Sequence, residues 1–589
     1  MNDTPPPPND PVQPPPSRRA WVLLGLGGLV TFGALVAAGV AFAVRGHHGE
    51  AQTGFLEVHL DETMADAPGD AGLTLDPGDF PPLVTETAAA LRRAAADPKV
   101  TGLYLEVGGT GLGWAGTQEL RDAVTAFTAS GKPCHAWAQE LDNKGYYLAS
   151  ACDQIHLAPA GLMLVNGLAV THAYYAGTLE KVGVKANFEH VGDYKSAVEP
   201  FTRAGPSDAA SEATEGLLGN LWDQVVDGIA AGRSIDAERV RALVDDPPMT
   251  PQAALEGGWV DALSYRDQVR EEKAGPERLE LGDYVRDAPS GTRTVAVVHA
   301  EGQIVSGESD SPLFGGTMIG DESFIEILDD VREDEEVAAV VLRVNSPGGS
   351  GLASDNIWHA VERLKAAGKP VVVSMGDYAA SGGYYIAAGA DRIVAEPGTL
   401  TGSIGVFGGK MNVAGLYDKL GITLHTWQRG AVAGLLSPTS DFSELERAKF
   451  RAFLEGFYET FLTRVAEGRG MQRDAVHAVA QGRVWTGAQA LDRKLVDELG
   501  GLDVAIARAR ELAKIPADES LTLRRLPERR TLFEQLLADV EGKGGARLAV
   551  DPMAMDPALR DAVGGFVALS RVLDHGGVAA MLPGRLHID

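Results

Sequence analysis

Cysteine is scarce in this chain of 589 residues, which contains only Cys134 and Cys152. Two cysteines cannot build a disulfide framework, and neither has a second Cys or His at the spacing of zinc ligands. We therefore expect neither a metal site nor a cofactor. Burial of the two thiols as small apolar side chains is the favoured interpretation, and a single disulfide stays open for a domain that faces an oxidising compartment.

Positive charge is also in short supply. The sequence has 52 Lys and Arg against 81 Asp and Glu, which gives a formal net charge of −29. Such a chain is a poor match for nucleic acid or for an anionic membrane surface. The apolar share of 45% is ordinary for a globular protein, and the length is sufficient for two to four domains.

One long apolar run lies near the N-terminus. Residues 20–44 contain no charged side chain and are numerous enough to cross a bilayer as a helix. A proline-rich segment, residues 1–19, precedes them, and Arg18 and Arg19 place the N-terminus in the cytoplasm by the positive-inside rule. We predict a retained transmembrane anchor. The alternative is a signal peptide that is cleaved at residues 41–43 (Ala-Phe-Ala).

Strand-like apolar runs alternate with helical stretches in the rest of the chain, which predicts an α/β fold with mainly parallel strands. The sequence also repeats itself. Residues 100–107 match 337–344 at an offset of 237 (337 − 100), and residues 145–159 match 383–397 at an offset of 238 (383 − 145). Matches at nearly the same offset continue through both halves. We infer that the domain is duplicated.

The duplication sets the predicted domain boundaries. A polar segment with Pro and Gly, residues 287–292, separates the two copies. Residues after about 520 have no counterpart in the first copy, so we expect them to form an extension. The predicted division is a cytoplasmic tail 1–19, an anchor 20–44, a first repeat 54–290, a second repeat 291–520 and a C-terminal extension 521–589.

The second copy carries a serine between a predicted strand and a predicted helix. Ser381 and two glycines follow a β-rich run, residues 369–375, and precede a small apolar stretch. A hydroxyl group in this position lies among free backbone N–H groups, where an oxyanion is stabilised. A lone Ser-Gly-Gly is more often a simple helix cap. The first copy has Asn143 at the equivalent position, so only the second copy retains a nucleophile.

A serine nucleophile needs a base, and no histidine of the second copy lies in a motif that would pair it with Ser381. The first copy instead carries Lys195 in a small, partly apolar loop, where the second copy has Ala433. Each copy retains what the other has lost, which predicts one composite site. Burial lowers the pKa of a lysine, so its neutral amine can accept the serine proton. Backbone N–H groups of Gly382 and Gly348 would hold the oxyanion.

Four short motifs extend this interpretation: residues 194–200 (Tyr-Lys-Ser-Ala-Val-Glu-Pro), 345–350 (Asn-Ser-Pro-Gly-Gly-Ser), 376–384 (Gly-Asp-Tyr-Ala-Ala-Ser-Gly-Gly-Tyr) and 401–405 (Thr-Gly-Ser-Ile-Gly). Together they resemble the long, two-domain form of signal peptide peptidase A, also called protease IV. The resemblance implies a tandem pair of Clp protease/crotonase-like α/β domains. It also implies a Ser/Lys dyad, with Ser381 as nucleophile, Lys195 as general base and Ser403 as the residue that orients the lysine amine.

The same resemblance carries expectations about location and partners. It implies a serine peptidase with a single membrane-spanning helix in the inner (cytoplasmic) membrane and its catalytic domains on the periplasmic, extracytoplasmic side. Members of the family assemble as homotetramers and degrade signal peptides after their release from exported proteins. We therefore expect apolar peptides as substrates, the lipid bilayer as a partner, and no nucleic acid.

Two other functions are compatible with such a fold, because fold alone does not determine function. The first is a crotonase-type acyl-CoA enzyme, whose sites usually carry carboxylates and a cationic surface for the CoA phosphates. The second is a non-catalytic membrane scaffold. The presence of both Ser381 and Lys195 favours a peptidase over either alternative.

Overall fold

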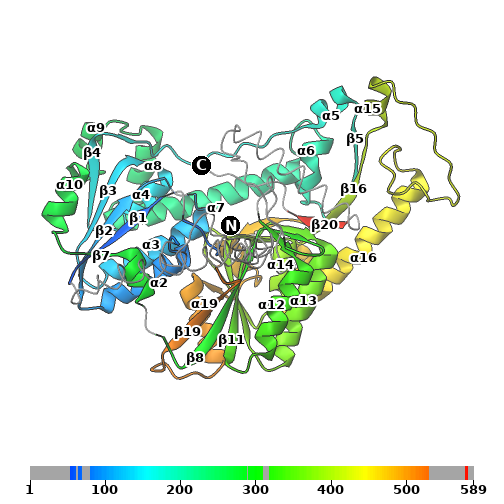
Figure 1. Cartoon of the computed structure of the whole chain (residues 1–589). Coiled ribbons are helices and arrows are strands. Elements are labelled where there is room, and N and C mark those ends of the chain that lie inside the picture. The colour runs from blue at the N-terminus through cyan, green and yellow to red at the C-terminus, as the bar shows by residue number, and fades with distance from the viewer. Residues whose placement is uncertain are drawn as a thin grey trace, which may run out of the picture. The chain divides into compact units, whose positions relative to one another are not determined.

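The computed structural model (Figure 1) describes residues 53–61, 64–68, 80–109, 111–287, 290–309, 317–529 and 578–581. The predicted tail 1–19, the predicted anchor 20–44 and most of the predicted extension 521–589 lie outside these residues. Within the described part of the chain, none of the helices combines the length and the apolar character needed to cross a membrane.

The first repeat is built on a parallel sheet of six strands in the order β6-β4-β3-β2-β1-β7. Apolar side chains of one face pack against helices α2 (Val84–Ala96), α3 (Trp114–Thr128) and α7 (Asp208–Arg233). The strands are β1 (Gly54–Leu60), β2 (Val100–Val107), β3 (Cys134–Leu141), β4 (Gln154–Met163), β6 (Ala262–Leu263) and β7 (Arg278–Glu280).

The second repeat is built on an eight-stranded sheet whose central strands are also parallel. Helices α12 (Asp321–Glu333) and α13 (Gly351–Ala366) cover one face, and α19 (Leu502–Leu512) packs on the apolar part of the other. The strands are β8 (Arg293–Glu301), β11 (Val337–Ser346), β13 (Val371–Ala380), β14 (Arg392–Ala395), β15 (Leu400–Gly402), β17 (Val484–Thr486), β18 (Glu498–Leu499) and β19 (Leu521–Leu526).

The two sheets share one strand order, which confirms the predicted α/β fold and its duplication. The order β7-β1-β2-β3-β4-β6 in the first repeat corresponds to β19-β8-β11-β13-β14-β18 in the second. Residues after 520 were expected to have no counterpart, and this expectation is wrong for β19. That strand pairs in parallel with β8 as β7 pairs with β1. The match escapes sequence comparison because a short edge strand has few constrained side chains.

A third sheet joins the two repeats, with the strand order β10-β9-β12-β20-β16-β5. Its strand β5 comes from the first repeat and pairs antiparallel with β16 from the second, with Val191 opposite Val406. The C-terminal strand β20 lies antiparallel between β12 and β16. The bounds are β5 (Lys185–Val191), β9 (Gln303–Val305), β10 (Met318–Gly320), β12 (Gly348–Ser350), β16 (Val406–Asn412) and β20 (Val578–Met581).

Buried charges also connect the repeats. The guanidinium of Arg343, on β11, lies 2.7 Å from a carboxylate oxygen of Asp66 and 2.8 Å from one of Glu119 on α3. Asp377, on β13, accepts hydrogen bonds from the backbone N–H groups of Gly113 and Gly116 at the start of α3. Because Arg343 and Glu119 are buried, and Asp66 and Asp377 are partly buried and paired, these contacts hold the repeats in one fixed register.

The two cysteines form a disulfide, with 4.9 Å between the Cα atoms of Cys134 and Cys152. The favoured expectation of two free thiols is therefore wrong, although both side chains are buried. Cys134 opens β3 and Cys152 follows helix α4 (Asn143–Ala149), so the bond ties the ends of one strand–turn–helix unit. The equivalent unit of the second repeat carries Ser381 and has no such bond.

Candidate active site

Strand β13 ends at Ala380, and Ser381 lies in the sharp turn between this strand and helix α14 (Gly382–Ala387). The backbone of Ser381 has φ 57° and ψ −114°, a region that residues with a side chain rarely adopt. Its N–H donates to the carbonyl oxygen of Gly402 at 2.8 Å, which helps to hold this geometry. Strain of this kind is typical of functional sites, where the surrounding structure fixes the residue.

The lysine reaches this serine through the third sheet. Lys195 follows β5 by a short turn in which its N–H donates to the carbonyl oxygen of Gly192. The pairing of β5 with β16 brings that turn onto the second repeat, where Tyr194 N–H donates to the carbonyl oxygen of Gln481 at 2.9 Å. Lys195 is only 2% exposed.

Three oxygen atoms surround the Lys195 side-chain nitrogen. Nζ lies 2.9 Å from Ser381 Oγ, 2.9 Å from Ser403 Oγ and 3.1 Å from the Ser403 carbonyl oxygen. The structure thus brings together the predicted nucleophile, the predicted base and the predicted orienting serine, and it does so within one chain. All three residues are buried.

Burial lowers the pKa of Lys195 from its ordinary value to about 7, because the charged amine loses its water and gains no carboxylate partner from the part of the chain that the structure describes. At neutral pH a large share of the amine is therefore uncharged. A neutral amine has two hydrogens and one lone pair. Ser403 offers two acceptors for the hydrogens, so the lone pair is left to face the hydroxyl of Ser381.

Ser403 occupies its place because the backbone after β15 turns sharply. Its φ is 52°, and its N–H donates to the carbonyl oxygen of Arg483 at 2.8 Å. Val165 stands at the equivalent position of the first repeat (403 − 238), where it is buried and has no hydroxyl group. The second repeat alone can therefore support a neutral lysine.

The glycines predicted to bind an oxyanion lie on both sides of the serine. Gly382 is the first residue of α14, and the N–H groups in the first turn of a helix have no acceptor within the helix. A side-chain carbon on Gly382 would lie within 2.6 Å of Ser354 Oγ and 3.1 Å of the Gly349 nitrogen, so this turn packs directly on β12. The N–H of Gly348 donates to Ser346 Oγ at 3.2 Å in the structure, so of the two glycines Gly382 has the freer donor.

Comparison with known proteins identifies the family of this chain. Residues 126–279 and 363–516 each match peptidase family S49. The two matches are offset by 237 (363 − 126), the offset of the internal repeat. The chain belongs to this family. It is a serine peptidase with two family S49 repeats, and this assignment argues against the acyl-CoA and scaffold alternatives.

Three relatives illustrate the similarity. The chloroplastic serine protease SPPA of Arabidopsis thaliana is 34% identical over 477 residues, which cover 78% of this chain and 69% of that protein. Protease 4 of Salmonella typhi is 36% identical over 489 residues, or 80% of this chain and 78% of that protein. A shorter protein of Enterococcus faecium, provisionally named signal peptide peptidase SppA, is 36% identical over 212 residues, which cover 36% of this chain and 62% of that protein.

Two residues that support the lysine of this S49 peptidase were missed by sequence reasoning. Gly482 has φ 81°, and a side-chain carbon there would lie 2.6 Å from the Lys195 backbone. Gln481, with φ 54°, accepts the hydrogen bond from Tyr194. A Gln-Gly pair before β17 signals a turn in the sequence, but nothing in the sequence shows that this turn lies under Lys195.

An apolar cluster adjoins the dyad. It combines the segment directly after Lys195 with side chains of β9, β10 and β16, and Phe188 and Phe201 pack against it. Its buried members are Ala197, Val198, Val305, Met318 and Phe407. Three strands of the sheet that reaches the dyad thus present apolar side chains on one side.

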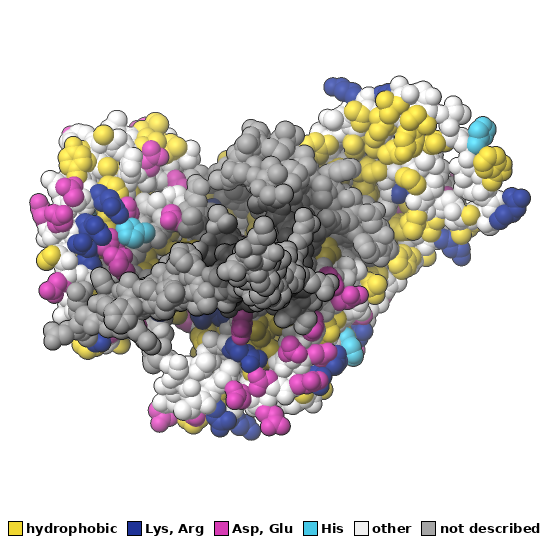
Figure 2. Space-filling model, viewed as in Figure 1, with side chains coloured by type: hydrophobic (Ala, Val, Ile, Leu, Met, Phe, Trp, Pro, Cys, Tyr) yellow, Lys and Arg dark blue, Asp and Glu magenta, His cyan; other side chains and the backbone are white. Residues whose placement is uncertain are grey.

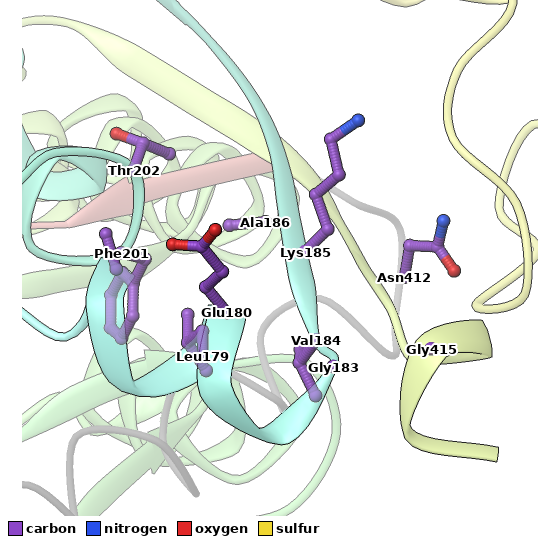
Figure 3. Close-up of a pocket in the computed structure, with 11 residues that line it drawn as sticks. Leu179, Glu180, Gly183, Val184, Lys185, Ala186, Phe201, Thr202, Asn412 and Gly415 are labelled. Carbon is purple, nitrogen blue, oxygen red and sulfur yellow. The ribbon is translucent and has the colours of Figure 1, made fainter. Parts of the chain in front are cut away.

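Two other features lie away from the dyad. A pocket of about 590 Å³ opens between helix α5 (Ala176–Val182), β5, helix α6 (Glu199–Thr202) and the start of helix α15 (Ala414–Lys419), and no predicted site residue lines it (Figure 3). Among the described residues, Glu57, His59 and Glu280 have the spacing of metal ligands. Arg270 and Arg278 already pair with Glu57, so this group is better explained as an ion-pair network.

Proposed function

We propose that this serine peptidase cleaves apolar peptides, among them signal peptides, with Ser381 as the nucleophile and Lys195 as the general base. The observation that carries the proposal is the 2.9 Å contact between Lys195 Nζ and Ser381 Oγ in a buried site. No carboxylate of the described residues holds the amine in its charged form, since burial alone shifts its pKa. The dyad therefore has both the distance and the protonation state that proton transfer requires.

The proposed reaction follows from this arrangement. Ser381 Oγ attacks the carbonyl carbon of the scissile peptide while its proton passes to Lys195 Nζ. The resulting ammonium gives that proton to the departing amine, which leaves an acyl-enzyme. A water molecule then attacks the ester, with Lys195 again accepting a proton, and the Ser381 hydroxyl is restored. Ser403 positions the amine throughout, because its two oxygens accept from Nζ.

The negative charge of the tetrahedral intermediate needs donors close to Ser381. We assign this role to the N–H of Gly382, which lies in the first turn of α14. The N–H of Gly348 is the second donor, provided that it turns from Ser346 Oγ to the substrate. This pair would be contributed by two different elements, α14 and β12, that pack against each other at Gly382.

An apolar substrate fits the surroundings of the dyad. The cluster of Val305, Met318 and Phe407 offers apolar contacts from strands that a bound peptide would extend. The name of the Enterococcus faecium relative and the motifs around Ser381 and Lys195 both point to signal peptides. The same motifs support a Clp protease/crotonase-like fold for each repeat.

The predicted location and assembly belong to the same proposal. We place the catalytic repeats on the periplasmic, extracytoplasmic side of the inner membrane, with residues 20–44 as a single anchor in the bilayer. The disulfide supports an oxidising compartment. Exposed apolar side chains between α15 and helix α16 (Glu444–Arg469) support a homotetramer, and Figure 2 shows hydrophobic side chains gathered in the region of α5 and α15. The exposed large apolar residues are Leu420, Ile422, Leu424, Trp427, Val432 and Leu436.

The test is hydrolysis of a fluorogenic apolar peptide by the full chain in detergent. We expect turnover by the natural chain and a loss of at least about a thousandfold in both Ser381→Ala and Lys195→Ala, because each change removes one member of the dyad. Gly456→Ala is the matched control, since its side chain would meet open space. Near-natural activity of Lys195→Ala would show that the base lies elsewhere.

A further inference from the structure

Three consecutive residues before and at the start of β17, 481–483, lie between the turns that carry Lys195 and Ser403. The first carbonyl oxygen of this segment accepts a hydrogen bond from the N–H of Tyr194, directly before the lysine, at 2.9 Å. The last, that of Arg483, accepts from the N–H of Ser403 at 2.8 Å. A shift of this segment would therefore reach both the proposed base and the serine that orients it.

The side chain of Arg483 also contacts the turn of the lysine. Its central guanidinium carbon lies 4.7 Å from the ring centroid of Tyr194, and Nη1 donates to Glu212 Oε1 at 2.6 Å. The hydroxyl group of Tyr194 donates to the other oxygen of Glu212 at 3.1 Å. The three side chains thus contact one another around the residue that precedes Lys195.

A tryptophan of the second repeat supports the guanidinium group. The central carbon of the Arg483 guanidinium lies 4.5 Å from the ring centroid of Trp485, which is buried. Trp485 pairs with Thr401 between β17 and β15, and its indole N–H donates to the carbonyl oxygen of Val479 at 2.9 Å. A planar guanidinium group stacks well on aromatic rings. The arginine therefore links a fixed ring of the second repeat to Tyr194 of the first.

The first repeat lacks this arrangement. In this part of the chain the offset between the repeats is 236, which relates the Val-Asp pair at 260–261 to the pair at 496–497. At this offset Pro247 stands at the position of Arg483, and Met249 stands at that of the tryptophan. Neither side chain provides a cation or an aromatic ring. The repeat without the serine nucleophile is thus also without the arginine and its support.

We propose that Arg483 is a positioning residue for the dyad. Its carbonyl oxygen fixes the turn of Ser403, and its guanidinium group fixes the turn of Lys195 through the contacts with Tyr194. This inference rests on the proposed function of Ser381 and adds a residue to it. Because the guanidinium group contacts the supports of the dyad rather than the reacting atoms, its loss should lower kcat far more than it changes KM.

The main test is Arg483→Met, which keeps the backbone carbonyl and removes the charge and the planar group. We expect kcat for the fluorogenic apolar peptide to fall about tenfold, with KM within about twofold, because a small displacement of the amine slows proton transfer. Rates are expressed per site titrated to completion with a serine-directed phosphonate, so an unfolded fraction is not counted. An unchanged kcat, or a loss confined to KM, would overturn the proposal.

Arg241→Met is the matched control. Arg241, on helix α8 (Ala237–Asp245), lies 3.0 Å from a carboxylate oxygen of Asp223 on α7, and Glu212, the partner of Arg483, lies on the same helix. The arginine side chains are 35% and 20% exposed, respectively. We expect the kcat and KM of the natural chain. A tenfold loss of kcat in this control as well would show that any ion pair of α7 has this effect, and it would overturn the specific role.

A double-mutant cycle tests the route through Tyr194. Tyr194→Leu removes the ring and the hydroxyl group that contact the arginine and its carboxylate partner, so we expect a loss of kcat similar to that of Arg483→Met. If the two side chains act as one unit, the double variant should lose about tenfold in total rather than about a hundredfold. Losses that multiply would show that Arg483 does not act through Tyr194, and they would overturn the proposal.

Labelling of the natural chain by the phosphonate distinguishes the two levels of the argument. If the natural chain neither cleaves the peptide nor reacts with the phosphonate, the proposed function of Ser381 fails. If it does both and Arg483→Met has the same kcat, the function stands and the positioning role of Arg483 fails.

Discussion

At the scale of single residues, the site depends on how Lys195 is held in a dry environment. Among the described residues, its nitrogen contacts only hydroxyl and carbonyl oxygens, from Ser381 and Ser403, and no carboxylate. Burial therefore acts alone on the pKa and lowers it to about 7. A carboxylate at this place would favour the ammonium form and would remove the base.

The pH dependence of catalysis follows from this pKa. Only the neutral amine accepts a proton, so kcat/KM should rise with pH through an apparent pKa of about 7 and then level off. Below the pKa, activity should fall about tenfold per pH unit. The measurement is a pH profile of kcat/KM with the fluorogenic peptide. The rate of phosphonate labelling should rise with pH through the same apparent pKa. An apparent pKa of about 9 or above in either profile would contradict a buried, neutral lysine.

At the scale of elements, the site is assembled by turns that need glycine. The turn before β17 lies directly under Lys195, because Gly482 has φ 81° and leaves no room for a side chain. The pairing of β5 with β16 brings Lys195 to that turn. Lys195, the proposed base, is thus placed by one strand pairing and by one glycine of the opposite repeat.

Gly482→Ala tests this arrangement. A methyl group would lie 2.6 Å from the Lys195 backbone, so the loop must shift and carry the amine away from Ser381. A shift of about 1 Å is enough to cost about a hundredfold in kcat. We expect that loss in peptide hydrolysis, with an unchanged circular dichroism spectrum. Gly456→Ala is again the control, and activity within twofold of the natural chain would contradict the role of this turn.

Sequence reasoning succeeded where the two repeats could be compared with each other. Ser381 and Lys195 stand out because Asn143 and Ala433 occupy their equivalent positions. Ser403 was implied by the resemblance to the family, and the structure places Lys195 Nζ within hydrogen-bond distance of both serine hydroxyls. Their catalytic roles stay predictions until the variants are measured. Comparison of the repeats predicts that the two copies meet at one site, but it does not show which strands and turns make the contact.

The features that sequence reasoning missed arise from contacts in the folded chain, within and between the repeats. The disulfide depends on how the ends of β3 and α4 return to each other. The role of Gly482 depends on a loop from the opposite repeat, and β20 pairs with strands that precede it by well over a hundred residues. None of these contacts has a local pattern of residues that would predict it.

At the scale of the whole molecule, a buried charge cluster fixes one repeat against the other. Burial alone would raise the pKa of Asp66, but the charge and hydrogen bonds of Arg343 hold it below its ordinary value. Burial raises the pKa of Glu119 despite the same arginine. One guanidinium thus compensates two carboxyl groups from the other repeat.

Arg343→Met should destabilise the protein strongly, because it leaves Asp66 and Glu119 buried without their partner. We expect a loss of about 3–5 kcal/mol in the free energy of unfolding, measured by denaturant titration at neutral pH. A triple variant with Asp66→Asn and Glu119→Gln removes the orphaned charges and should recover part of the loss. A change below about 1 kcal/mol in Arg343→Met would show that the cluster does not hold the repeats together.

The meeting of Lys195 and Ser381 within one chain has a genetic consequence. Each gene copy must encode both halves of the dyad, since neither half can be borrowed from a neighbouring chain through this contact. A cell that carries one allele without the serine and another without the lysine should therefore behave as a null. The two repeats have diverged from one domain, and the proposed reaction needs one residue from each. Both repeats must therefore be intact in the same gene copy.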